Sequence, residues 1–171
     1  ARWDGNVWST VGDGTGVVDD YFGTPQAGQI NTMVLSADKL YVGGEFVSID
    51  GVPANNVAQW DGNSCSALGQ GMGRLDWESK FTAEGEVNAL ALDGTTLYAG
   101  GDFVIAGDVT ANAVAQWDGN GWSALDGGVT RIDGNGNPEN GIVKALAVAE
   151  GMLYVGGWFT QAGATSANHV A

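Results

Sequence analysis

Short apolar stretches recur along the chain at nearly constant intervals. One kind is almost continuously apolar, with the sequences INTMVL at 30–35, VNALAL at 87–92 and VKALAV at 143–148. A second kind ends in two glycines and a phenylalanine, with the sequences LYVGGEF at 40–46, LYAGGDF at 97–103 and LYVGGWF at 153–159. Short apolar runs between turn residues predict buried β-strands. The paired glycines indicate a bend, or a place where another backbone approaches closely.

Two further patterns extend each pair of predicted strands to four. The third strand is predicted in ANNVAQWDG at 54–62, in ANAVAQWDG at 111–119 and in the shorter stretches ANHVA at 167–171 and ARWDGN at 1–6. The fourth is predicted in VWSTV at 7–11, SCSAL at 64–68 and GWSAL at 121–125. The Asp-Gly pair between them predicts a two-residue type I′ hairpin turn, which requires positive φ at both central residues.

The spacing of these patterns sets the predicted architecture. Trp3, Trp60 and Trp117 are each 57 residues apart. Four antiparallel strands in a repeat of about 57 residues, with a glycine pair and an indole at fixed places, predict an all-β fold of β-propeller blades. A linear β-solenoid is the alternative, although its repeat is normally shorter.

The repeat resembles a known family. The run L-Y-x-G-G-x-F followed by A-N-x-V-A-x-W-D-G-x-x-W-x-x-L is similar to the delta-sixty, kelch-like propeller repeat, and the similarity covers essentially the whole chain. That family occurs in bacterial surface and secreted proteins and in fungal cortical-marker proteins. The resemblance implies a propeller fold and an extracellular or cell-surface location. It implies no reaction, because the family is defined by its blade.

We expect residues 1–171 to form one propeller segment with three four-stranded blades. The stretches 30–68 and 87–125 are predicted to be complete blades, while 1–11 supplies strands three and four of a blade that begins in 143–171. Three blades are fewer than the usual four to eight. We therefore expect the chain to assemble with itself, as a homodimer with six blades or a homotrimer with nine. An excerpt from a longer array and an open assembly are the alternatives.

Composition narrows the range of partners. Acidic residues outnumber basic ones by 20 to 6, and the formal net charge is −14. Phosphate recognition uses clustered lysine and arginine, so we expect neither nucleic acid nor an anionic membrane surface as a partner. No stretch approaches the roughly 20 apolar residues of a membrane span, so no membrane insertion is predicted. Cys65 and His169 are the single cysteine and histidine, which excludes an intrachain disulfide and a multi-histidine metal site within one chain.

The long connections between units are the predicted binding face. They span 12–29, 69–86 and 126–142, with nearly equal lengths but dissimilar sequences. Variable loops on a fixed scaffold are a common way to build a binding surface. Drift in unconstrained loops is the alternative.

Aspartates recur in these connections and suggest a calcium site. Asp19, Asp76 and Asp133 are each 57 residues apart, and Asp133 begins the sequence DGNGNPE. Alternating oxygen carriers resemble the start of a calcium loop, and the candidate ligands are Asp19, Asp76, Asp133, Asn135, Asn137 and Glu139. The resemblance to an EF-hand is partial, because Pro138 stands where that loop has glycine. The alternative is that each aspartate caps its own loop by accepting backbone N–H groups.

Two of the seven tryptophans are candidate contact residues, and the other five are predicted to pack inside the blades. Trp77 lies in a connection and belongs to no repeated motif, while Trp158 stands where the other units have Glu45 and Asp102. Tryptophan is enriched among the residues that dominate binding energy. Cys65 replaces a repeated tryptophan and is predicted to be a smaller core residue.

The predicted function is binding without catalysis. A copper oxidase would need histidines and a crosslinked Cys–Tyr pair, which this chain cannot assemble, and no activated nucleophile is evident. The many loop carboxylates keep a glycoside-active enzyme open, since that chemistry needs two of them. We expect an extracellular propeller module that binds a protein or a glycan and assembles with itself. A purely structural, self-assembling surface or filament component is the alternative.

Overall fold

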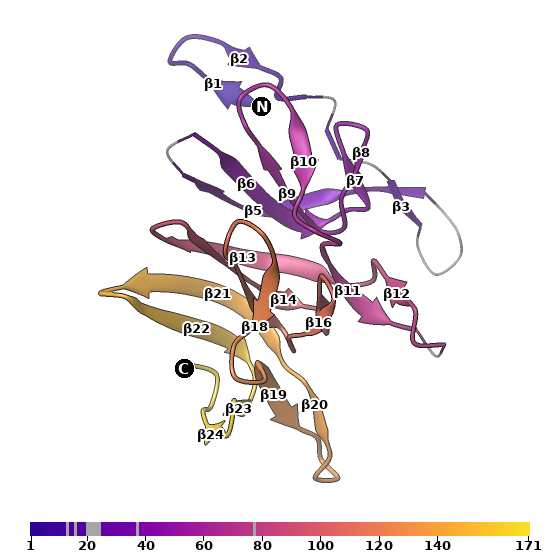
Figure 1. Ribbon diagram of the computed structural model, residues 1–171, viewed down its shortest axis with the longest axis vertical. Helices are drawn as coiled ribbons and strands as arrows, with labels where there is room; N and C mark the ends of the chain where they lie inside the picture. Colours follow the sequence, from indigo (N-terminus) through magenta and orange to yellow (C-terminus); the bar gives the residue numbers. More distant parts are fainter. Residues whose placement is uncertain (13, 16, 20–24, 37, 77) are drawn as a thin grey trace.

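The computed structural model describes residues 1–12, 14–15, 17–19, 25–36, 38–76 and 78–171. Within these residues the chain forms strands β1 to β24 and no helix, which confirms the all-β prediction (Figure 1). Accordingly, the described part of the chain contains no helix that could cross a membrane.

Two repeat units each form a four-stranded antiparallel sheet. The first sheet has the order β10-β9-β6-β5 and consists of β5 (Gln29–Leu35), β6 (Leu40–Glu45), β9 (Val57–Trp60) and β10 (Cys65–Ala67). The second has the order β13-β14-β17-β18 and consists of β13 (Glu86–Asp93), β14 (Thr96–Asp102), β17 (Val114–Trp117) and β18 (Trp122–Ala124). In both sheets, strands that follow one another in the sequence lie side by side.

The remaining unit is divided between the two ends of the molecule. Strands β21 (Ile142–Ala149) and β22 (Met152–Trp158) pair with each other, and Val170 adds an isolated bridge to Gly156. The third and fourth strands, β1 (Arg2–Trp3) and β2 (Trp8–Ser9), form a separate hairpin at the opposite end of the stack of sheets (Figure 1). The two halves of this unit therefore do not pair within the chain.

The three sheets pack on one another through a glycine–valine contact. A Cβ atom on Gly43 would overlap a methyl group of Val87, and one on Gly100 would overlap a methyl group of Val143. Val87 and Val143 are fully buried, and a β-bulge follows each of them in β13 and β21. The glycines thus allow each following strand to approach closely, as the paired glycines of the sequence indicated.

Tryptophans complete the contact between the first two sheets. The rings of Trp117 and Trp122 lie 5.3 Å apart, and the residues are only 8% and 6% exposed. The indole nitrogen Nε1 of Trp122 donates a hydrogen bond of 2.8 Å to the carbonyl oxygen of Leu68 in the first sheet. Trp3 and Trp8, which were also predicted to be packed, are instead exposed, because the other half of their sheet is not beside them.

The connections between units are strands rather than the irregular loops that the sequence suggested. Three hairpins form the connections: β3–β4 (Val17–Asp19, Pro25–Ala27), β11–β12 (Met72–Leu75, Phe81–Thr82) and β19–β20 (Val129–Ile132, Pro138–Asn140). Two more hairpins lie between the second and third strands of a unit, β15–β16 (Ile105–Ala106, Val109–Thr110) and β23–β24 (Gln161–Ala162, Thr165–Ser166). They extend two of the connecting hairpins into sheets with the orders β12-β11-β15-β16 and β20-β19-β23-β24. A sixth hairpin, β7–β8 (Ser48–Ile49, Val52–Pro53), has an isolated bridge from Ile49 to Thr15.

The Asp-Gly turns also differ from the prediction of two-residue type I′ turns. Trp60 is paired with Cys65, so the loop contains four residues, and positive φ occurs at Gly62 but not at Asp61. The Asp61 carboxylate instead accepts hydrogen bonds from the backbone N–H groups of Asn63 (2.9 Å) and Ser64 (2.8 Å). This carboxylate bonding satisfies the loop backbone, and it recurs at Asp4 and Asp118.

We predict that Gly100→Ala lowers the free energy of unfolding by about 1–3 kcal/mol, because the new methyl group would overpack the contact with Val143. Gly121→Ala is the matched control, since a Cβ there meets nothing within 4 Å and the other units carry Ser64 and Val7 at this position. Its effect should stay within about 0.5 kcal/mol. Urea unfolding measures both. Equal stabilities of the two variants would contradict the proposed role of the glycine.

Candidate functional site on the hairpin face

Two of the hairpins project from the same side of the stacked sheets. We call the surface formed by β11–β12 and β19–β20, together with the hairpins they pair with, the hairpin face (Figure 1). In β11, Met72 pairs with Ala106, and in β19, Val129 pairs with Ala162. Each projecting hairpin is therefore held by the unit that follows it in the sequence.

A polar cleft with a volume of about 480 Å³ lies between these hairpins. Its lining comes from β11, β14, β19, β20, β21 and the turn after β14, and consists of Arg74, Asp102, Val104, Arg131, Glu139, Asn140 and Ile142. The cleft therefore combines two cations, two carboxylates and an amide with two aliphatic side chains.

Two ion pairs hold the charged side chains of the cleft in place. Arg74 pairs with Asp102, and Arg131 pairs with Glu139; all four side chains are partly exposed. Arg74 and Arg131 are 57 residues apart, so they occupy the same position of the repeat. Because the pairs are partly exposed to solvent, they orient the groups more than they stabilise the fold.

Asn140 brings an unsatisfied hydrogen-bond acceptor to this cleft. Its side-chain Nδ2 donates to the carbonyl oxygen of Phe103 at 3.1 Å. Its Oδ1 is buried and has no partner; within the described residues, only Oγ1 of Thr82 shares this condition among side-chain atoms. A buried acceptor without a donor is costly, so this amide carries a local free-energy penalty beside the cleft.

Trp158, a predicted contact residue, lies beside this cleft. The Arg131 guanidinium carbon lies 4.7 Å from the centre of the Trp158 ring, a cation–π contact. Trp158 is also paired with Ile142, which lines the cleft, and it is 56% exposed. The indole therefore extends the polar cleft with an accessible aromatic surface. Trp77, the other predicted contact residue, lies outside the described residues.

The predicted calcium ligands are distributed over different hairpins. Asp76 and Asp133 lie at the tips of β11–β12 and β19–β20, respectively. The Asp76 carboxylate accepts backbone N–H groups from Glu78 (2.8 Å) and Lys80 (2.9 Å). Asp19 ends β3, and its side chain lies outside the part of the chain that the structure describes.

At the tip of β19–β20, the aspartate has the same capping role. Asp133 accepts the backbone N–H groups of Asn137 and Asn135, both at 2.8 Å, and these bonds lower the pKa of its carboxyl. Glu139 pairs with Arg131 instead of joining Asp133. Among the described residues, no three His, Cys, Asp or Glu side chains lie close enough together to hold a metal ion. The geometry accounts for Asp76 and Asp133 by capping, and the calcium site stays a prediction.

Calcium binding can be tested by thermal unfolding with calcium and with a chelator. If the predicted ligands Asp133, Asn135, Asn137 and Glu139 bind the ion, calcium should raise the midpoint, because a ligand that binds only the folded state stabilises it. Asp133→Asn should reduce that rise, while Asp93→Asn on β13 serves as the control. An unchanged midpoint in wild-type protein would contradict the calcium prediction.

Four loop aspartates should make stability depend on pH below about 4. Backbone N–H groups lower the pKa of these carboxyls from the ordinary value of 3.8, at Asp4, Asp61, Asp118 and Asp133. A lowered pKa in the folded state means that this stabilisation is present above pH 3.8 and is lost as the pH falls through the folded-state pKa. Urea midpoints should therefore fall in acid.

The double variant Asp61→Asn/Asp118→Asn should lose less stability between pH 5 and pH 3 than the wild type, because two of the four titrating groups are gone. Asp93→Asn is the control, since the described structure gives its carboxylate no hydrogen bond. If the double variant follows the wild-type curve over this range, the capping bonds do not cause the acid sensitivity.

Comparison with known proteins supports the propeller architecture. A family model described as a domain of unknown function (DUF5122) β-propeller matches residues 37–63, which include β6 and β9 of the first sheet. Neither the curated proteins nor the solved structures searched contained a match. The short match and the series of four-stranded sheets together indicate a protein of the β-propeller class.

Proposed function

We propose that this chain is a non-catalytic β-propeller module that binds a protein or a glycan through its hairpin face and assembles with itself. Its units are three blades of the delta-sixty, kelch-like class, completed by a second copy of the chain. The observation that carries the binding role is the polar cleft with Trp158 at its edge.

The chemistry of the cleft suits a partner rich in hydroxyl and amide groups. The arginines donate hydrogen bonds, while the carboxylates accept them. Sugars and peptide backbones carry hydrogen-bond donors and acceptors close to one another. The exposed Trp158 ring adds a flat apolar surface for the C–H face of a sugar or for an apolar side chain.

The hairpins that carry the cleft are tied to the sheets beneath them. The buried Asn56 side chain donates to the carbonyl oxygens of Met72 (2.9 Å) and Ala83 (2.8 Å), and accepts the backbone N–H of Phe46 (3.0 Å). At the next hairpin, Asn140 makes the corresponding bond to the carbonyl oxygen of Phe103. A surface that is ordered before binding loses less conformational entropy when a partner arrives.

We propose no reaction for this face. Its two carboxylates, Asp102 and Glu139, are each engaged by an arginine, whereas a glycosidase needs one carboxylic acid free to deliver a proton. We propose a location outside the cell or at its surface, in keeping with the delta-sixty resemblance. The net charge of −14 suits a soluble module that does not bind polyanions.

A purely structural role, as a surface or filament component, is the second candidate. It is favoured by the large apolar side chains exposed at the N-terminal end of the stack, among them Trp8, Met33 and Leu35. Long ordered polymers in electron micrographs, with no partner bound at the hairpin face, would favour this role over the binding role.

Glycan-array binding tests the hairpin face. We predict that Trp158→Ala weakens binding of any captured glycan at least tenfold, about 1.4 kcal/mol, because it removes the exposed ring and the support of Arg131. Met152→Ala is the control, since Met152 is similarly exposed at the other end of β22 and should leave binding unchanged. Equal binding by both variants would contradict the proposed site, and absence of any bound glycan would leave only a protein partner.

A further inference from the structure

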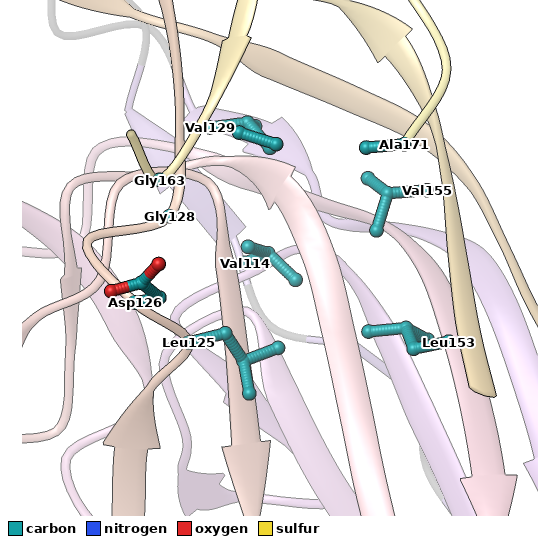
Figure 2. A pocket seen from close by; sticks show the side chains of 10 residues that line it. Val114, Leu125, Asp126, Gly128, Val129, Leu153, Val155, Gly163 and Ala171 are labelled. Carbon is teal, nitrogen blue, oxygen red and sulfur yellow. The ribbon is translucent and has the colours of Figure 1, made fainter. Parts of the chain in front are cut away.

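An apolar pocket of about 320 Å³ opens between the second four-stranded sheet and the β21–β22 pair (Figure 2). Leu125, Leu153, Val155 and Ala171 form apolar parts of its wall, and Asp126 and Gly163 lie at its edge. Figure 2 shows the side chains of Leu125 and Leu153 on either side of the opening, below Val155 and Ala171. The pocket shares no lining residue with the polar cleft, although Val129 of β19 and Ala162 of β23 form part of its wall.

The repeat shows what normally fills this space. Leu125 and Asp126 correspond to Leu68 and Gly69, 57 residues earlier, in the first sheet. There, Trp122 donates its indole N–H to the Leu68 carbonyl, and its ring lies beside Gly69 and Gly107, where a Cβ would be 3.5 Å and 3.3 Å from it. Trp117 packs beside it, so two indoles occupy at the first contact the place where the second contact has the pocket. The Asp126 side chain takes up part of that place, because it lies over Gly163, the counterpart of Gly107.

The chain carries a matching pair of indoles at its other end. Trp3 and Trp8 occupy the repeat positions of Trp117 and Trp122. They are 50% and 70% exposed, yet their rings lie 5.3 Å apart at 45°, against 5.3 Å and 52° for the buried pair. The β1–β2 hairpin therefore already has the shape of the missing element. It lies at the opposite end of the stack from the pocket, so this hairpin does not reach the pocket of its own chain (Figure 1).

A second pair of surfaces matches in the same way. Gly156 is the counterpart of Gly43 and Gly100, but a Cβ on Gly156 would meet nothing closer than 3.8 Å. Ile30 is the counterpart of Val87 and is 43% exposed instead of buried. Within one chain, Ile30 has no glycine to pack on, and Gly156 has no aliphatic side chain packed against it. Ile30 would pack on Gly156 if the N-terminal end of one copy docked on the C-terminal end of another.

We propose that the pocket binds the β1–β2 hairpin of a second copy of this chain, with Trp3 and Trp8 inside it and Ile30 against Gly156. This inference rests on the self-assembly part of the proposed function and specifies its contact. The segment up to Ala171 already pairs with Val155 through backbone bonds of 2.7 and 3.0 Å. The second copy's hairpin would continue that strand and complete the divided blade. The contact joins unlike surfaces, so it is head-to-tail.

The net charge sets the conditions in which the contact should form. Each copy carries a net charge of −14, so two copies repel one another at low ionic strength. Of the residues that the structure describes, Asp126 is the one charged side chain in the lining of the pocket, and salt screens charge repulsion without weakening apolar burial. Association should therefore strengthen as sodium chloride is raised, opposite to the behaviour of an interface held by ion pairs.

Sedimentation velocity over a range of concentrations tests the proposal. Wild-type protein should sediment as a dimer or larger species, and Trp8→Ala should weaken association at least a hundredfold, as expected for a central tryptophan of an interface. Because Trp8 is exposed in the single chain, its removal should leave the melting midpoint of the dilute monomer unchanged. Leu75→Ala, exposed on the hairpin face, is the control and should associate like the wild type.

A second variant tests the other side of the proposed contact, the surface around Gly156. Gly156→Val fills the space for Ile30 but should be accommodated in the single chain, where Gly156 has room. Alone it should be monomeric, as should Trp8→Ala. Mixed, the two should form a one-to-one dimer, because Trp8→Ala retains an intact pocket and Gly156→Val retains an intact hairpin.

The outcomes separate this inference from the function on which it rests. A monomeric wild-type protein would overturn both self-assembly and the proposed contact. A wild-type oligomer that persists in Trp8→Ala and Gly156→Val, or a mixture that fails to form the one-to-one dimer, would overturn the contact alone. Closed rings and open head-to-tail polymers would both support it.

Discussion

How closely one sheet can approach the next determines the rest of this structure. Gly43 and Gly100 leave room for Val87 and Val143, and no larger residue could stand at either glycine without moving the neighbouring sheet. Dispersion attraction falls steeply over a gap of even half an ångström, so this approach decides how well the whole surface packs. The tryptophans, the hairpins and the cleft are all placed by that spacing. At Gly156 no valine of a following sheet packs on the glycine, and the surface there is open.

The sequence predicted the meander sheets well because the information for them is local. The apolar runs of β5, β6, β13 and β14 are separated by short turns, so strands adjacent in the sequence pair in space. The hairpin layer could not be predicted in this way. Its strand β11 pairs with β15, about thirty residues later and in the following unit, and neither strand shows a strong apolar alternation. Such pairing depends on how the sheets are stacked.

The candidate site was predicted in part. The 57-residue spacing identified Asp76 and Asp133, but backbone N–H groups within each turn use these carboxylates. The same spacing relates Arg74 to Arg131 and was visible in the sequence. Their role could not be inferred, because the cleft exists only once Asp102 of the second sheet lies beside Arg74 and the β19–β20 hairpin, with its own pair Arg131 and Glu139, lies next to them. Trp158 stood out because it replaces an acidic residue of the repeat, and it lies at this cleft.

The amides that hold the hairpins come from different positions of the repeat at the two junctions. Asn56 reaches from its sheet toward Ala83 on the hairpin, whereas at the next junction Asn140 reaches from the hairpin to the strand beside Ala113. Each junction thus has one amide opposite one alanine, on alternate sides. The same tie between sheet and hairpin is thus made from two different positions of the repeat, so at each position one unit can carry a small residue where the other carries the amide.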